Sequence, residues 1–207
     1  MEAFEDIMRR GGSAAIEEVG RFFMRDDPVH RALRKVASRL NDLHIPYAVA
    51  GGMALVANGY DRTTVDVDIL VTPEGLKDVH RNLDGLGYLP PFTGSRHLRD
   101  TEHGVKIEFL VAGQFPGDGK PKPVAFPDPT ACSFEKDGIR YVSLITVFEM
   151  KLASGMSNPG RLKDLGDVQE LIRTLKLPKD FGAQLNPYVL EKYEELWTAV
   201  QNDKISD

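Results

Sequence analysis

The sequence predicts an α/β protein in which a small sheet with flanking helices is followed by a helical C-terminal part. Two observations carry this prediction. Short apolar segments that end at Gly or Pro alternate with helical patterns up to residue 143, and residues 144–207 show helical spacing only. We therefore expect three parts: N-terminal helices over 1–44, a core over 45–143, and a helical region over 144–207.

The N-terminal part is predicted to be helical. Apolar residues in 1–24 recur at helical spacing, and the pair Gly11–Gly12 interrupts them. A new helix is expected to start with Asp27 as N-cap and Pro28 at the first helical position, because proline has no N–H to leave unpaired there. This helix should end near Leu43.

The core is predicted to alternate strands and helices. Gly and Pro residues mark the ends of the segments, and hydrophobic alternation marks the two longest strands. A turn at Asp137–Gly138 indicates a further hairpin. The other expected elements are a strand over 47–50, a helix over 53–58, a strand over 65–71, a helix over 73–83, and strands over 95–98 and 105–111.

The segment 113–130 differs from the rest of the core. It contains five prolines and three glycines, so we expect a long surface loop without regular structure. We interpret it as a segment that closes over an acceptor molecule. Beyond it, helices are predicted over 147–153, 161–175 and 187–201.

Composition excludes several classes of protein. A net charge of −5 argues against extensive coating by nucleic acid, and a single cysteine excludes an internal disulfide and a Cys-based zinc site. No apolar run approaches the roughly 18 residues that a membrane-spanning helix needs. The acidic N-terminal segment does not resemble a signal peptide. We expect a cytoplasmic protein that does not bind membranes.

Two aspartates in an apolar strand are the main candidates for a site. Asp66 and Asp68 alternate with aliphatic residues, so both should point to one face of the strand over 65–71. Glu108 has the same pattern in the strand over 105–111 and would complete a three-carboxylate cluster if the two strands are neighbours. Oxygen ligands of this kind suit Mg²⁺. Alternating acids also occur on any half-exposed strand, so this pattern alone leaves a solvated face open.

A glycine pair upstream changes that balance. Gly51 and Gly52 lie where a buried strand meets a helix, so backbone N–H groups there could approach a phosphate closely. Alone, such a pair is more often a tight turn. Together with two carboxylates about 15 residues downstream, it indicates a site for a metal and a phosphorylated ligand.

These residues carry a family resemblance. Gly51–Gly52 followed by Asp66-Val67-Asp68 resembles the signature of the polymerase-β-like nucleotidyltransferase superfamily. The stretch GGMALVANGYDRTTVDVDIL is similar to a subgroup that contains AbiEii-type toxins and antibiotic-modifying nucleotidyltransferases, in which an arginine and a threonine precede the aspartates, as Arg62 and either Thr63 or Thr64 do here. Glu108 is similar in context to the third acid of the family.

The helical part extends the resemblance over residues 45–175. Lys151 and the run 161–167 are similar to a region that, in the subgroup, supplies a lysine to the triphosphate and acids to the site. The resemblance therefore implies a small mixed β-sheet nucleotidyltransferase core. It implies Mg²⁺, or Mn²⁺ in its place, at Asp66, Asp68 and Glu108. The implied nucleotide-binding residues are Gly51, Gly52, Arg62, Thr64, Lys151, Asp164 and Asp167.

The implied reaction moves a nucleoside monophosphate from a nucleoside triphosphate, such as ATP, onto an acceptor and releases pyrophosphate. The base is not specified by the sequence. The acceptor is either tRNA or another RNA, as for a toxin that pairs with an antitoxin protein, or a small hydroxylated molecule. The alternative is a non-catalytic module that binds nucleotides or a partner on the same scaffold. Retention of three acids and both glycines counts against this alternative.

Overall fold

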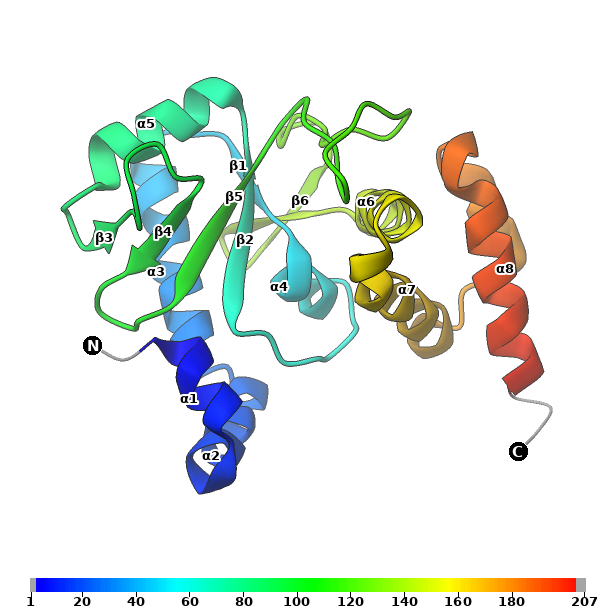
Figure 1. Ribbon diagram of the computed structural model, residues 1–207, viewed down its shortest axis with the longest axis horizontal. Helices are drawn as coiled ribbons and strands as arrows, with labels where there is room; N and C mark the ends of the chain where they lie inside the picture. Colours follow the sequence, from blue (N-terminus) through cyan, green and yellow to red (C-terminus); the bar gives the residue numbers. More distant parts are fainter. Residues whose placement is uncertain (1–2, 204–207) are drawn as a thin grey trace.

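A seven-stranded mixed sheet organises the chain (Figure 1). The structure, a computed structural model, describes residues 3–203. The strand order is β3-β4-β5-β2-β1-β7-β6, with β2–β5 and β1–β7 parallel and the other pairs antiparallel. The predicted α/β class with a mixed sheet is confirmed. The strands are β1 (Tyr47–Val49), β2 (Asp66–Val71), β3 (Tyr88–Leu89), β4 (His97–Asp100), β5 (Lys106–Val111), β6 (Ser133–Lys136) and β7 (Ile139–Val142).

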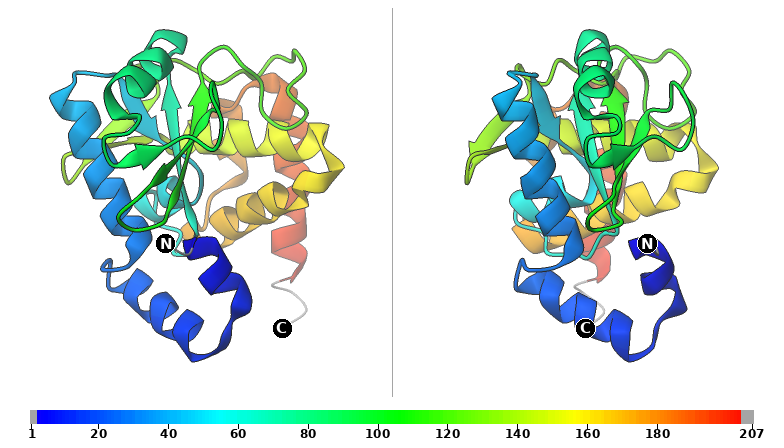
Figure 2. Two further views of the ribbon diagram at one scale, coloured as in Figure 1. Left: turned by 60° about the vertical axis from the view of Figure 1, so that its left-hand side comes forward. Right: turned by 90° about the vertical axis from the view of Figure 1, so that its left-hand side faces the viewer.

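Helices flank this sheet and form the C-terminal part. The described helices are α1 (Phe4–Arg10), α2 (Gly12–Phe23), α3 (Pro28–Asp42), α4 (Gly51–Ala57), α5 (Pro73–Leu83), α6 (Leu144–Ser157), α7 (Leu162–Leu175) and α8 (Pro187–Asp203). Helices α1 and α2 lie together at one end of the molecule, as both views in Figure 2 show. Helices α6, α7 and α8 pack against one another beside the sheet. No helix within residues 3–203 is long and apolar enough to cross a membrane.

Alternation along β2 divides the interior into two cores. Val67 and Ile69 are fully buried in a cluster with α3 and α5. Leu70 points the other way, into a cluster formed with α4, α6, α7 and α8. Burying one such side chain stabilises the fold by about 1.5–3 kcal/mol. Asp66 and Asp68 lie on the same side of β2 as Leu70 but nearer the start of the strand.

Local signals predicted several boundaries correctly. Gly11, with φ +70°, separates α1 from α2. The Asp27 side chain accepts hydrogen bonds from the N–H groups of Val29 (2.8 Å) and His30 (3.2 Å) and so caps α3. The β6–β7 hairpin turns at Asp137–Gly138, where both residues have positive φ.

Other boundaries differ from the prediction. Helix α4 begins at Gly51, two residues before the predicted start, and α6 extends beyond 147–153 in both directions. Strand β4 lies two residues later than expected because its register is set by pairing with β5. The two-residue strand β3 was not expected, since its pairing with β4 is a tertiary contact that leaves no local pattern.

The segment 113–130 has no helix or strand, as predicted, and is docked on the C-terminal helices. A Cβ added at Gly117 would lie 2.7 Å from the carbonyl oxygen of Ser154 on α6. The Asn186 side-chain amide donates to the carbonyl oxygen of Pro123 at 3.5 Å. The segment thus connects the end of β5 to α6 and to the residue before α8.

Candidate active site

The two strands that carry the candidate acids are direct neighbours. Strands β2 and β5 pair in parallel, with Asp68 beside Glu108 and Asp66 beside Lys106. Neighbouring strands lie about 4.8 Å apart, and laterally paired residues point to the same face. The condition set for a three-carboxylate cluster, that the strands be neighbours, is therefore met. Asp66, Asp68 and Glu108 share one face of the sheet.

The glycine pair makes room for two side chains of the site. Gly51 has φ +55°, and a Cβ added there would lie 1.7 Å from Oδ2 of Asp68. A Cβ at Gly52 would lie 2.6 Å from the Cβ of Thr64. The backbone N–H of Ala50 also donates to the carbonyl oxygen of Asp68 at 2.8 Å. Only glycines allow the Asp68 carboxylate and the Thr64 side chain to lie this close to the start of α4.

Thr64 positions the first aspartate. Its hydroxyl donates to Oδ1 of Asp66 at 2.8 Å, and the Thr64 side chain is buried against Gly52. The hydrogen bond restricts the rotation of the Asp66 carboxylate. Thr64 therefore links the glycine pair to Asp66, and its contacts are with protein groups of the site.

The electrostatics of Asp68 indicate uncompensated negative charge. Burial, together with the charges of Asp66 and Glu108, raises the pKa of Asp68 from 3.8 to about 7. The positive charges of Lys151 and Lys106 oppose this rise without cancelling it. A hard divalent cation binds carboxylate oxygens and would supply the missing positive charge. The donor set therefore fits Mg²⁺ or Mn²⁺.

Glu108 has a different environment from Asp68. It accepts a hydrogen bond from Nζ of Lys106 at 2.7 Å, and its Oε2 lies 3.8 Å from Nδ1 of His97 on β4. Burial would raise the pKa of Glu108, but the hydrogen bond and charge of Lys106 outweigh it and lower that pKa. Glu108 is thus ionised at neutral pH.

The C-terminal helices bring cations to the same face. Nζ of Lys151 on α6 lies 3.0 Å from Oδ1 of Asp164 and 2.7 Å from Oδ2 of Asp167, both nearly buried on α7. Arg62 also pairs with Asp167. The charge of Lys151 offsets part of the rise in the pKa of Asp68, and the charge of Arg161 contributes to the lowered pKa of Glu108, so both cations act on the carboxylates.

The two acids of α7 hold these cations in place. The Ser154 hydroxyl (2.7 Å) and Nε of Arg161 (2.8 Å) donate to Oδ2 of Asp164. Burial would raise the pKa of Asp164, but Lys151, Ser154 and Arg161 outweigh it and lower that pKa.

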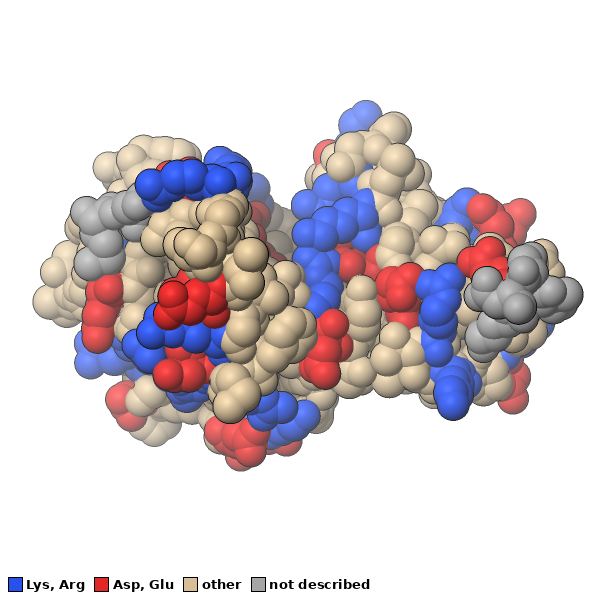
Figure 3. All heavy atoms as spheres, turned by 90° about the horizontal axis from the view of Figure 1, so that it is seen from below, with Lys and Arg blue, Asp and Glu red and all other residues tan. Residues whose placement is uncertain are grey.

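Seen from below, the surface is hollowed between the sheet part and the helical part, with Lys and Arg side chains beside the hollow (Figure 3).

Sequence reasoning placed ten residues in the site and missed several others. Lys106 could have been found from its period-2 spacing with Glu108, since i and i+2 share a strand face. His97 and Ser154 lacked any such signal, because tertiary pairing brings them near the acids. Arg161 was noticed in the sequence as the first residue of the run 161–167, without a role of its own.

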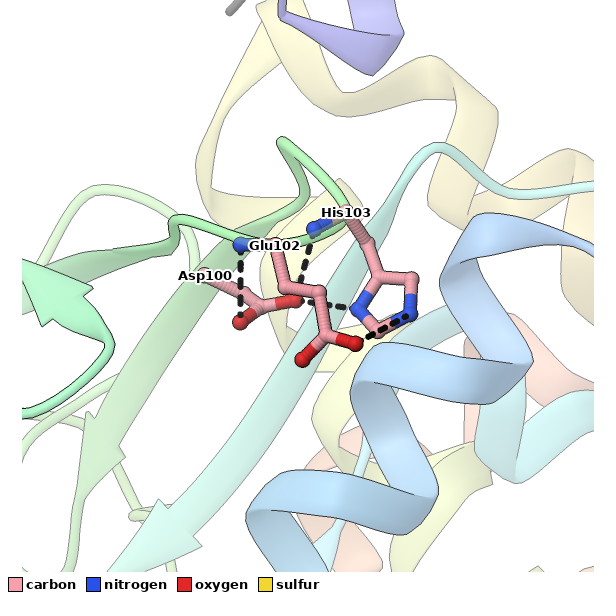
Figure 4. Close-up of side chains that lie close together, drawn as sticks. All are labelled: Asp100, Glu102 and His103. Atoms are coloured by element: carbon pink, nitrogen blue, oxygen red, sulfur yellow. Dashed lines mark hydrogen bonds and ion pairs between the residues drawn. The ribbon is translucent and has the colours of Figure 1, made fainter.

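A second acidic cluster lies in the turn between β4 and β5 (Figure 4). Within residues 3–203, Asp100, Glu102 and His103 form the one group of three such side chains whose ligand atoms all lie within 4.8 Å of one another. Nζ of Lys35 already contacts Oδ1 of Asp100 (2.6 Å) and Oε2 of Glu102 (2.9 Å). The lysine therefore supplies the positive charge that a metal ion would bring.

Comparison with known proteins gives no family assignment. No model of a protein family matches the sequence, and no curated protein matches it. A crystal structure of ANT(2″)-Ia in complex with adenylyl-2″-tobramycin is similar with a TM-score of 0.48 and 14% identity, over 84% of this chain and 97% of that chain.

Two further solved structures are similar at the same low level. One is a Thermotoga maritima protein assigned as a nucleotidyltransferase, with a TM-score of 0.42 and 21% identity over 70% of this chain and 89% of that chain. The other is an H. pylori protein with the same assignment, with a TM-score of 0.46 and 15% identity over 83% and 91% of the two chains. Identities and TM-scores this low do not place the chain in a family.

Proposed function

We propose that the protein is a Mg²⁺-dependent nucleotidyltransferase that moves a nucleoside monophosphate from a nucleoside triphosphate onto an acceptor hydroxyl. The observation that carries the proposal is the parallel pairing of β2 with β5, which places Asp68 beside Glu108 on the face that also holds Asp66. The raised pKa of Asp68 supports it, because an unneutralised carboxylate cluster is suited to a divalent cation.

Each residue has a proposed role. Asp66, Asp68 and Glu108 would hold Mg²⁺, with Mn²⁺ as a substitute. The bound cation supplies charge neutralisation of the phosphates. Glu108, which is ionised, also accepts the proton of the acceptor hydroxyl. The hydroxyl oxygen forms a bond to the α-phosphorus, the bond from that phosphorus to the α–β bridging oxygen breaks, and pyrophosphate leaves.

The remaining residues bind the triphosphate. Lys151 and Arg62 are the cations proposed for its β- and γ-phosphates, and Asp164 and Asp167 orient them through the ion pairs described above. Backbone N–H groups at Gly51 and Gly52 are proposed to face the phosphates. Thr64 acts there through its hydrogen bond to Asp66.

A label-transfer experiment tests the proposal. The four α-³²P-labelled nucleoside triphosphates are incubated with Mg²⁺, a bacterial cytosolic extract, and either wild type or Asp66→Asn/Asp68→Asn. Products are separated into RNA, protein and small-molecule fractions. The matched control is Asp78→Asn, which removes an exposed carboxylate on α5, the helix that follows β2 and packs on the side of the sheet opposite to Asp66 and Asp68.

The proposal expects label with wild type and Asp78→Asn and none with the double variant. Label in RNA would support a toxin-like role and a search for an antitoxin, and label in small molecules would support a role like that of antibiotic-modifying enzymes. If the folded wild type binds triphosphates but transfers no label, the protein acts as the non-catalytic nucleotide-binding module.

A further inference from the structure

The face that carries the three acids continues across the sheet to a pocket. Two rows of laterally paired residues cross this face. One row runs Leu89, Arg99, Lys106, Asp66 over β3, β4, β5 and β2. The other runs His97, Glu108, Asp68. Paired residues share a face, so the β3 end and the β2 end of these rows belong to one continuous surface.

A cavity of about 240 Å³ lies at the β3 end of these rows. Leu89, Pro90 and Pro91 give it apolar walls, and His97, Arg99 and Lys106 form the side nearest the acids. A 150 Å³ apolar cavity is enough to bind benzene, so a pocket of this size holds a single ring with a short substituent. The pocket is open to a compact ligand with an apolar ring.

The two cations of the pocket are already paired. Both NH groups of Arg99 contact Glu5, at 2.7 and 3.1 Å, and Lys106 contacts Glu108 at 2.7 Å. Neither charge is left over for a phosphate backbone. This favours a neutral ligand over a polyanion, in agreement with the net charge of −5.

His97 joins the pocket to the acids. Its Nδ1 is buried and lacks a hydrogen-bond partner among residues 3–203, and it lies 3.8 Å from Oε2 of Glu108. A buried polar atom without a partner is costly, so a ligand group that satisfies it is favoured. Because Nδ1 has almost no exposed surface, a ligand hydroxyl reaches it only when the imidazole turns toward the pocket, and a hydroxyl between His97 and Glu108 could then hydrogen-bond to both.

We propose that this pocket binds the acceptor, and that the acceptor is a small, uncharged, hydroxylated molecule whose apolar ring lies against Leu89 and Pro91 and whose hydroxyl lies between His97 and Glu108. This proposal rests on the nucleotidyltransferase function proposed above and specifies its substrate class. His97 acts in it as a positioning residue, because it orients the hydroxyl whose proton passes to Glu108.

The test uses 2-phenylethanol, which combines one ring and one hydroxyl, as the probe. Saturation-transfer NMR on the full chain, without metal or nucleotide, compares wild type with Leu89→Trp, whose indole fills the pocket. Leu86→Trp is the matched control, since Leu86 and Leu89 are similarly exposed (63% and 55%) and only Leu89 lines the pocket. We expect Leu89→Trp to reduce the probe signal at least fivefold and Leu86→Trp to leave it unchanged.

Label transfer in the extract assay separates the acceptor role from probe binding. Leu89→Trp should reduce labelling of the small-molecule fraction at least tenfold while Mg²⁺-dependent triphosphate binding stays as in wild type. Full labelling by Leu89→Trp, an unchanged probe signal in that variant, no probe signal in wild type, or label confined to RNA would each overturn the acceptor assignment.

Failure of the parent function has a distinct signature. Wild type would then bind 2-phenylethanol and Leu89→Trp would not, but wild type would show neither Mg²⁺-dependent triphosphate binding nor label transfer. That result overturns the acceptor assignment together with the nucleotidyltransferase function.

Discussion

In the turn between β4 and β5, the buried carboxylate of Asp100 is hydrogen-bonded to Nζ of Lys35 and to Nδ1 of His103, each at 2.6 Å. On β2, Asp68 has two acids as neighbours and no hydrogen bond of this kind to its side chain among the described residues. Burial acts to raise both pKa values. Lys35 and His103 reverse that effect for Asp100, whose pKa is lowered, whereas the pKa of Asp68 rises to about 7.

This difference distinguishes a structural cluster from a candidate catalytic one. Asp100, Glu102 and His103 have the close spacing of metal ligands, because their carboxylate and imidazole atoms already lie together. They lie together because cations and N–H groups satisfy them. Carboxylates without a neighbouring cation repel one another. Close spacing of acids in the absence of a metal therefore marks a cluster whose charge is already compensated, and not the cluster that needs a metal.

The largest expected effect is on activity. Asp68→Asn should reduce Mg²⁺-dependent label transfer by about 10³-fold, which corresponds to about 4 kcal/mol of transition-state stabilisation. Asp100→Asn should transfer label as wild type does once corrected for folded protein. Both rates are measured at 25 °C with circular dichroism as the check on folding. An Asp68→Asn variant that retains more than a tenth of the wild-type activity would contradict the assignment of Asp68 to the catalytic site.

The second effect is on stability, and here the turn between β4 and β5 matters rather than β2. Asp100→Asn should lower the free energy of unfolding by about 3 kcal/mol, because it leaves Lys35 without its buried partner. Urea unfolding measures this loss. Asp78→Asn, at an exposed ion pair, is the control and should change stability by less than about 1 kcal/mol. An unchanged stability in Asp100→Asn would show that the cluster is not structural.

A smaller effect concerns pH in the absence of metal. The unfolded chain ionises Asp68 near 3.8 and the folded chain near 7, so the folded state binds the proton more tightly. The contribution of Asp68 to stability therefore falls by about 1.4 kcal/mol for each pH unit between about 4 and about 7 and is level above that, so the loss between pH 5 and pH 8 is on the order of 2 to 3 kcal/mol. Urea unfolding in EDTA at pH 5 and pH 8 measures the loss.

Two comparisons check the assignment of this pH effect. Asp68→Asn should have a smaller loss between pH 5 and pH 8 than wild type, and saturating Mg²⁺ should restore the stability of wild type at pH 8. An identical pH dependence in wild type and Asp68→Asn would refute the raised pKa.

The smallest effect compares the lysines of the two regions. Lys151→Met should weaken binding of a nucleoside triphosphate with Mg²⁺ by about tenfold, or 1.4 kcal/mol, because it removes one charge-assisted contact to the phosphates. Lys35→Met should leave this dissociation constant unchanged while lowering stability. Isothermal titration calorimetry measures both constants. Equal affinities in wild type and Lys151→Met would argue against a triphosphate contact.

Local patterns predicted most of the fold and the principal acids. The Asp27–Pro28 helix start and the alternation in β2 and β5 depend on neighbours in sequence, so they were readable from the chain. The sequence could not show whether β2 and β5 are neighbours, so the three-carboxylate cluster was conditional on that pairing. The structure contains it. The lateral rows to β3 and β4, and with them the role proposed for His97, depend on register, which no local pattern encodes.

The sequence also assigned roles that the structure refines. Gly51 and Gly52 were expected to bring the backbone close to phosphates, and the structure adds that they accommodate the side chains of Asp68 and Thr64. The triphosphate-binding roles and the lid-like role of 113–130 stay predictions. Docking of that segment on α6 favours a fixed connection between the sheet and the helices.

The most direct test of the account is a titration with Mn²⁺ followed by electron paramagnetic resonance, in which the signal of free Mn²⁺ disappears on binding. Wild type, Asp66→Asn/Asp68→Asn and Asp100→Asn are compared at pH 7.5, with and without a nucleoside triphosphate. The account predicts that wild type and Asp100→Asn bind Mn²⁺ alike, more tightly with the triphosphate, and that the double variant does not. Binding that survives in the double variant and is lost in Asp100→Asn would contradict it.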